Sequence, residues 1–243
     1  STKMKQFYPT LLLLFFISTG FALQGQNLTG DVFVSSRNDN SVKRYDRQTG
    51  NYMGDFVISN AGGLSRPQEV LFHSSGDLLV TGRDNASILR FNGTTGDFMG
   101  NFTSGYTLDN PTKTMIGPDG FLYVSQWGAV KNKVIRFNAE TGQFIDEFTS
   151  SGVFQGCGQA WDQEGNLYVA SWGNGSQGNV QKFDTAGVFQ GIFVQAGQIQ
   201  GPTNIWFTAD GELHVADWTL GKVARFDGQS GVFLGNFLTG MTS

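Results

Sequence analysis

The chain has 243 residues, a formal net charge of −4, and charged side chains at 15% of its positions. Without an excess of Lys and Arg it lacks the basic footprint that phosphate binding needs, which argues against nucleic acid as a partner. The 34 glycines and 22 phenylalanines favour an all-β protein with many tight turns, and so many aromatic residues exclude a disordered chain.

The first predicted element is an export signal at residues 1–22. Lys5 follows the first methionine, Met4, and residues 11–17 (LLLLFFI) form an apolar core that ends near the small residues Gly20 and Ala22. A transmembrane helix needs about 20 apolar residues, so we expect no membrane span in the mature chain. The signal predicts a secreted, periplasmic or cell-surface protein, with a short linker at residues 23–29.

An internal repeat fills the rest of the chain. A basic residue followed by an aromatic one recurs at residues 44, 90, 136, 182 and 225, which gives steps of 46, 46, 46 and 43 residues. A turn glycine recurs at residues 50, 96, 142, 187 and 231, with steps of 46, 46, 45 and 44 residues. The two anchors agree, so we predict five copies, near residues 30–57, 66–103, 111–149, 157–194 and 202–238.

Each complete copy predicts four short strands. In the third copy they cover residues 112–116, 121–125, 133–138 and 143–148. Tight glycine turns join antiparallel neighbours, so each copy forms a meander. Because the strands are apolar on both faces, each sheet must be covered on both sides, and radial stacking achieves this. The predicted fold is an all-β propeller of four-stranded antiparallel blades; a β-solenoid fits the hairpin turns and the repeat length less well.

The two ends of the repeat array differ from its middle. The first copy lacks its first strand, and the chain stops soon after the last strand of the fifth copy. Residues 1–3 precede Met4, which suggests upstream readthrough or a gene fragment. We therefore expect part of a six-bladed or larger ring, or an open five-bladed ring if these residues form the whole protein.

The repeat resembles a known propeller family. The third copy reads PDGFLYVSQW and then VIRFNAETGQF, and similar patterns occur at residues 64–72 and 90–102. These motifs resemble the NHL-type repeat of exported bacterial proteins, and more distantly the streptogramin lyase and gluconolactonase propellers. The resemblance covers about residues 30–238. It implies a propeller fold, and it specifies the activity poorly because this fold carries many functions.

Four positions are predicted to line the central channel. Seven residues before the turn glycines at positions 76, 120, 165 and 211 stand Glu69, Lys113, Gly158 and Asn204, and Gln159 beside Gly158 is a further polar candidate. The likeness to gluconolactonases implies calcium at Glu69 and Asn204, whereas Lys113 in the same ring argues against a cation. Two oxygen donors are fewer than the six or so that calcium takes. We therefore expect a polar channel without a cofactor, with calcium as the alternative.

A second column lies at the ends of the second strands. Its members are Arg37, Arg83, Trp127, Trp172 and Trp218. Aromatic residues beside polar loops stack on sugars and other flat ligands, and they also pack between blades. Both interpretations stay open at this point.

No catalytic constellation emerges from the sequence. His73 and His214 fall in different parts of their repeats, and Cys157 is expected to be a buried, inert thiol. We therefore predict an exported, non-catalytic scaffold that binds an unknown protein or carbohydrate. The alternatives are a metal-dependent lactonase-like or lyase-like enzyme, and a carbohydrate-binding propeller.

Overall fold

The computed structural model describes residues 30–241, so the predicted signal peptide and linker lie outside the described residues. Its nineteen strands form five antiparallel sheets, four of them with four strands and one with three. This confirms the all-β propeller with five blades. Each sheet corresponds to one copy of the sequence repeat, and the sheets are called blades 1 to 5 in chain order. The three-stranded sheet is blade 1, as the missing first strand of copy one predicts.

Blades 1 and 2 are built from seven strands. Blade 1 contains β1 (Val32–Ser36), β2 (Ser41–Tyr45) and β3 (Tyr52–Val57). Blade 2 contains β4 (Pro67–Phe72), β5 (Leu78–Gly82), β6 (Ser87–Phe91) and β7 (Phe98–Asn101). The short 3-10 helix η1 (Ala61–Gly63) connects the two blades.

Blades 3 to 5 each have four strands. Blade 3 contains β8 (Pro111–Ile116), β9 (Leu122–Gln126), β10 (Ile135–Phe137) and β11 (Phe144–Glu147). Blade 4 contains β12 (Gly156–Trp161), β13 (Leu167–Ser171), β14 (Asn179–Phe183) and β15 (Phe189–Val194), with the 3-10 helix η2 (Gly173–Gly175) after β13. Blade 5 contains β16 (Pro202–Phe207), β17 (Glu212–Asp217), β18 (Lys222–Asp227) and β19 (Phe233–Leu238).

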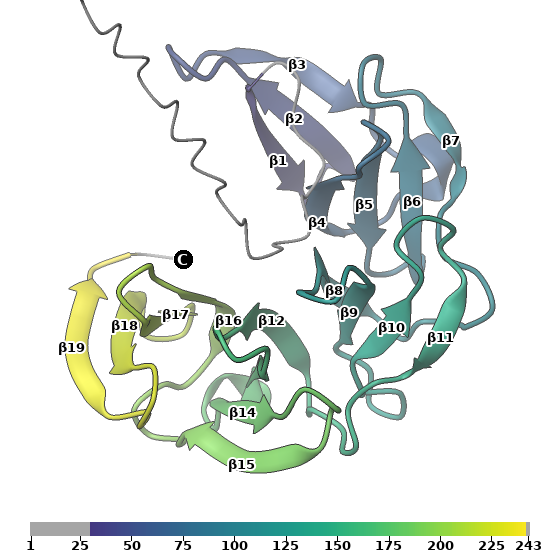
Figure 1. Ribbon diagram of the computed structural model, residues 1–243. Helices are drawn as coiled ribbons and strands as arrows, with labels where there is room; N and C mark the ends of the chain where they lie inside the picture. Colours follow the sequence, from purple (N-terminus) through teal and green to yellow (C-terminus); the bar gives the residue numbers. More distant parts are fainter. Residues whose placement is uncertain (1–29, 242–243) are drawn as a thin grey trace, which may run out of the picture.

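The blades follow one another around a central axis (Figure 1). The first strands of blades 2 to 5, β4, β8, β12 and β16, lie innermost, and the last strands lie on the outer rim. Successive inner strands contact each other, from β4 to β8, then β12 and β16. Blades 1 and 5 form the two ends of the arc. No helix among residues 30–241 is long and apolar enough to cross a membrane.

The glycine turns between the first and second strands have the geometry that the sequence predicts. Gly120 has a φ of 82°, and its N–H donates to the carbonyl of Gly117 at 3.0 Å. Gly76, Gly165 and Gly211 repeat this turn at φ values of 88°, 83° and 88°. Positive φ costs glycine little and most other residues more. The turns therefore fix the hairpin register in each of these blades.

A three-residue cluster joins each blade to the next. In blade 4 the ring of Tyr168 lies 4.9 Å from Phe193 of its own blade and 4.9 Å from Phe207 of blade 5. Equivalent sets occur at the other boundaries: Phe33, Phe56 and Phe72; Leu79, Phe102 and Ile116; Tyr123, Phe148 and Trp161. These clusters are called boundary clusters below. They explain why the repeat places large apolar residues on both faces of each sheet.

Blade 5 has a different arrangement at this position. His214 replaces the tyrosine, and its ring lies 5.3 Å from Phe237 and 5.4 Å from Trp206, both within blade 5. Phe237 is 59% exposed, although its counterparts Phe102 and Phe148 are buried. Within residues 30–241, this face of blade 5 has no neighbouring blade to cover it.

Truncating a boundary cluster should destabilise the whole ring. We expect Tyr168→Ala to lower the free energy of unfolding by about 3–5 kcal/mol, because it removes a buried ring between two blades. Tyr168→Phe keeps the ring and loses only the hydroxyl contact to Asp162 at 3.1 Å, so its cost should be about 1 kcal/mol. Urea unfolding of both variants measures the difference. Equal costs for the two variants would contradict the assigned role of the ring.

Candidate functional site

The inner strands bring four equivalent side-chain positions to the channel. In blades 2 to 5, Val70, Thr114, Gln159 and Ile205 all pair with the same position of the second strand. The residues just before them, Glu69, Lys113, Gly158 and Asn204, are therefore equivalent, and they are called the channel ring. The sequence spacing identified this ring. Gln159 lies one position further along the strand.

Gln159 connects two blades. Its side chain is 1% exposed, and its amide nitrogen donates to the backbone carbonyls of Lys113 at 3.2 Å and Tyr123 at 3.0 Å. Both acceptors belong to blade 3, whereas Gln159 belongs to β12 of blade 4. A buried amide with two backbone partners is well suited to fasten one blade to another.

An ion pair crosses the channel ring. The ammonium nitrogen Nζ of Lys113 lies 2.8 Å from Oε2 of Glu69, which joins β8 to β4. Gly158 supplies no side chain, and a Cβ at this position would lie 2.6 Å from Cα of Asn204. The inner strands of blades 4 and 5 therefore approach closely because residue 158 is glycine. Asn204 is exposed.

The channel ring does not fit a calcium ion. Calcium takes about six to eight oxygen ligands, and carboxylates supply most of their charge. The ring offers one carboxylate, which is already bonded to Lys113, and one amide at Asn204. Among residues 30–241, no group of three or more His, Cys, Asp or Glu side chains is placed to hold a metal.

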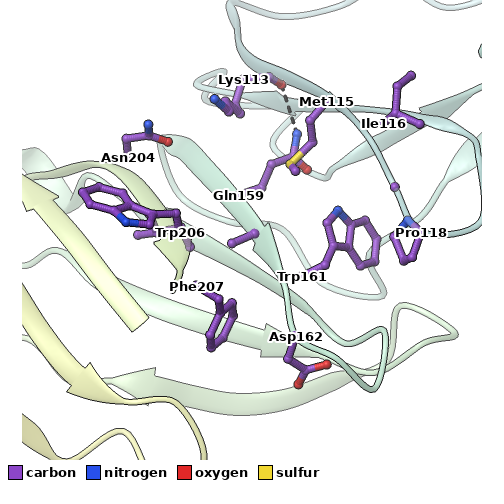
Figure 2. A pocket seen from close by; sticks show the side chains of 13 residues that line it. Lys113, Met115, Ile116, Pro118, Gln159, Trp161, Asp162, Asn204, Trp206 and Phe207 are labelled. Carbon is purple, nitrogen blue, oxygen red and sulfur yellow. Dashed lines mark hydrogen bonds between the residues drawn. The ribbon is translucent and has the colours of Figure 1, made fainter. Parts of the chain in front are cut away.

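A cavity of about 490 Å³ adjoins the channel ring (Figure 2). It is bounded by the inner strands of blades 3 to 5, with Met115, Trp161, Trp206 and Phe207 among its lining residues. Asp162 also lines it, but its carboxylate accepts hydrogen bonds from Asn166 and Tyr168. The cavity walls are thus mainly aromatic and apolar. Trp161 and Trp206 were not among the predicted site residues, although their place on the inner strands was a usable signal.

The second predicted column is held by backbone hydrogen bonds at the end of each second strand. The N–H of Trp127 donates to the carbonyl of Asn110 at 2.9 Å, just before β8 begins. The same bond occurs from Arg83 to Arg66 at 3.3 Å, from Trp172 to Gln155 at 3.1 Å, and from Trp218 to Gly201 at 2.9 Å. The column residues of blades 2 to 5 are therefore tied to the start of an inner strand, at the mouth of the channel, whereas Arg37 belongs to blade 1, whose described strands include no such inner strand.

The acceptor residues have unusual backbone angles. Arg66, Asn110 and Gln155 have φ values of 47°, 51° and 52°. Such left-handed conformations are unfavourable for residues other than glycine, by about 1–3 kcal/mol where they are strained. Residues held in this way cluster at functional sites more than elsewhere. In blades 2, 3 and 4, the residue just before the inner strand has this unfavourable conformation at the channel mouth.

Three members of the column are connected by ring contacts. The guanidinium carbon of Arg83 lies 5.1 Å from the ring centre of Trp127, within the range of a cation–π contact. The rings of Trp127 and Trp172 are 5.6 Å apart at an interplanar angle of 39°. Trp172 lies against Gly201, where an added Cβ would come within 2.7 Å of the indole. We call Arg83, Trp127 and Trp172 the mouth ladder.

Trp218 does not join the mouth ladder. It is 61% exposed, and no ring contact is found for it among residues 30–241. The five candidates of the second column therefore divide. Trp127 contacts both Arg83 and Trp172, whereas Arg37 and Trp218 have no ring contact with them among residues 30–241.

Arg83 is a partly buried cation without a carboxylate partner in hydrogen-bonding contact. Burial and then the nearby charge of Arg37 lower the pKa of Arg83, while Asp84 acts in the opposite direction. Its Nε atom is buried and has no hydrogen-bond partner within residues 30–241. The adjacent Asp84 forms its ion pair with Arg66, at 3.2 Å. The guanidinium of Arg83 is therefore left without a hydrogen-bonded anion at the channel mouth.

The thiol and the two histidines serve packing. Cys157 is 5% exposed, as predicted, and its Sγ lies 3.3 Å from the carbonyl of Gln155. His73 links blade 2 to blade 3, because its Nε2 lies 2.6 Å from the carbonyl of Ala139. His214 contacts Glu212 at 3.1 Å in blade 5. These groups lie in separate places and do not form a common centre.

No protein-family model and no curated protein sequence matches the chain. Solved structures do match it. Virginiamycin B lyase from Staphylococcus aureus gives a TM-score of 0.63 at 15% identity. That match covers 86% of this chain and 66% of the lyase chain. A gluconolactonase from Xanthomonas campestris gives a TM-score of 0.67 at 14% identity. That match covers 88% of this chain and 74% of the gluconolactonase. The chain thus spans less than two thirds of the lyase. At these identities the similarity establishes a distant propeller relationship. It does not indicate which activity this chain has.

The buried thiol provides a direct test of the structure at the channel mouth. Burial raises the pKa of Cys157 from its ordinary value of 9.0 to about 12. We expect Cys157 to react with a thiol reagent at about pH 8 only in the presence of denaturant. Because the folded pKa is raised, this thiol favours the folded state below about pH 9 and loses that effect as the pH rises towards 12. Rapid labelling of the native protein would contradict this packing.

The ion pair of the channel ring predicts a measurable coupling. In a double-mutant cycle with Lys113→Met and Glu69→Gln, we expect a coupling energy of about 0.5–1 kcal/mol, since both side chains are partly exposed and solvent screens the pair. Urea unfolding of the four proteins gives this value. It should fall at high salt. A coupling of zero at low salt would show that the two side chains do not pair in solution.

Proposed function

We propose that this chain is a ligand-binding propeller that acts through its channel mouth and does not catalyse a reaction there. The observation that carries the proposal is the mouth ladder, in which the cation of Arg83 contacts Trp127, which in turn contacts Trp172. Loops that surround a rigid scaffold commonly carry binding functions. Here the strained acceptor residues and the backbone bonds hold the ladder in a fixed position.

An enzymatic function is the competing proposal. Virginiamycin B lyase and gluconolactonase are enzymes by name, and both share the propeller fold. Catalysis of either kind needs an available acid, base or metal ligand. Glu69 is the acidic residue of the channel ring, and its carboxylate is bonded to Lys113. His73 and His214 are engaged in separate blades. These contacts favour binding over turnover.

Carbohydrate binding is a second candidate function. The observation that favours it is the cavity beside the channel ring, which Trp161 and Trp206 help to line. Indole rings are suitable platforms for the apolar face of a sugar. This candidate places the ligand at the inner strands of blades 3 to 5, whereas the favoured proposal places it at the mouth ladder. The two sites can therefore be separated by mutation.

The cellular location is also a proposal. The apolar core and the small residues at 1–22 support export, and they lie outside the described residues. An exported binding propeller meets its ligand outside the cytoplasm. The identity of a protein or carbohydrate partner does not follow from these features.

Thermal stability in the presence of ligands tests the function and the site together. The purified protein is melted against panels of organic acids, sugars, peptides and lactones, because a ligand that binds the folded state raises the melting temperature. We expect at least one panel to stabilise the protein, and we expect Trp127→Leu to abolish that shift. The matched variant Trp206→Leu, which alters the cavity, should retain it.

The remaining outcomes separate the alternatives. A shift lost in Trp206→Leu and retained in Trp127→Leu would favour the cavity and carbohydrate binding. Release of product from a lactone or a cyclic depsipeptide, at a rate that depends on enzyme concentration, would overturn the non-catalytic proposal. Stabilisation by no compound in any panel would count against a small-molecule site at the mouth.

A further inference from the structure

The guanidinium of Arg83 is unusual among the arginines of residues 30–241. Five arginines have carboxylate partners in the structure: Arg44 with Asp31, Arg66 with Asp84, Arg90 with Asp77, Arg136 with Asp146, and Arg225 with Glu212. The described residues form no such pair with Arg37, Arg47 or Arg83, and of these three only Arg83 has a buried side-chain nitrogen without a hydrogen-bond partner. The chain has 20 acidic residues against 16 basic ones, so acids are in excess. The pairing pattern thus leaves one partly buried guanidinium group unpaired at the channel mouth.

A guanidinium group without a partner is a poor structural element and a good anion receptor. Partial burial of Arg83 removes water from its charge, and that loss is offset only when an anion or another acceptor is close. The planar fork of N–H groups fits a carboxylate through two parallel hydrogen bonds.

The indoles beside this cation define the rest of the ligand. Trp127 contacts both Arg83 and Trp172. Both indoles are half-buried, so part of each remains open at the mouth. These open parts offer apolar surface beside the guanidinium of Arg83.

We infer that the channel mouth selects a small organic anion with an apolar body, which places its carboxylate at Arg83 and its body against Trp127 and Trp172. This inference rests on the proposed binding function and adds the chemical class of the ligand. Acetate carries the charge without the body, and a neutral aromatic amide carries the body without the charge. Neither should bind as well as a molecule that combines the two.

A pair of isosteric probes tests the inference. Binding of 1-naphthaleneacetate and of its neutral amide, 1-naphthaleneacetamide, is measured by calorimetry on the intact protein. Since a hydrogen bond to a charged group contributes about 1.5–3 kcal/mol, the acid should bind about tenfold more tightly than the amide or better. Higher salt should weaken the binding of the acid and leave the binding of the amide unchanged.

Variants locate the two parts of the site. Arg83→Gln should reduce the affinity for the acid to that for the amide, and Trp127→Leu should weaken both probes. Arg90→Gln is the matched control, because it removes the same charge from blade 2 where Arg90 is paired with Asp77. It should bind both probes like the unmodified protein. Thermal melts establish that each variant is folded, and Arg83→Lys supplies a second test, since it keeps the charge and loses the planar fork.

Two results would overturn the inference in different ways. Equal binding of acid and amide, with both weakened by Trp127→Leu, would leave a ligand site at the mouth and refute its selection of anions. Binding of neither probe would refute the inference and would also count against the mouth ladder as a small-molecule site. An acid preference that survives Arg83→Gln would place the anion elsewhere.

Discussion

The boundary cluster is the interaction on which the rest of this structure depends. A single sheet of this repeat is apolar on both faces, so it cannot exist in water alone. Each blade contributes one side chain from its second strand, one from its outer strand, and receives a third from the next inner strand. At the boundary between blades 4 and 5 these are Tyr168, Phe193 and Phe207. The third contact fixes where the next inner strand begins and ends.

The geometry of the channel mouth follows from that placement. Once an inner strand is positioned, the carbonyl just before it accepts the N–H at the end of the second strand, as Asn110 does from Trp127. The side chains at these ends are then carried towards their neighbours in adjacent blades. Arg83, Trp127 and Trp172 come from blades 2, 3 and 4, and they meet because the three blades repeat the same bond. The repeat thus supplies a regular frame, and sequence variation at one position supplies the chemistry.

Much of this fold was predictable from the sequence, because the repeat marks its own turns. The spacing of turn glycines and basic–aromatic pairs predicted five blades and a first sheet with three strands, and both are present. The same register placed Glu69, Lys113, Gly158 and Asn204 at equivalent positions of the inner strands. Periodicity determines such positions along the chain, since each residue is compared with its counterpart one repeat later.

The contacts between blades were harder to predict, because they depend on the direction of each side chain. The sequence indicated that Lys113 shares a ring with Glu69, but it did not show that the two form an ion pair. It did not reveal the bonds of Gln159 to the backbone of blade 3. It placed Trp218 in one column with Trp127, and the same backbone bond occurs at both, but among residues 30–241 only Trp127 has ring contacts. Trp206 appeared as a strand residue, and only the packing of three inner strands brings it to a cavity.

Crystallographic location of a bound anion would test the central claim most directly. Crystals of the protein are soaked with a brominated 1-naphthaleneacetate, and the bromine is located by its anomalous scattering. We predict one bromine site beside Trp127 and Trp172, with the carboxylate within hydrogen-bonding distance of the Arg83 guanidinium. A bromine site in the cavity beside Trp206, or Arg83 paired with a carboxylate of the protein itself, would contradict it.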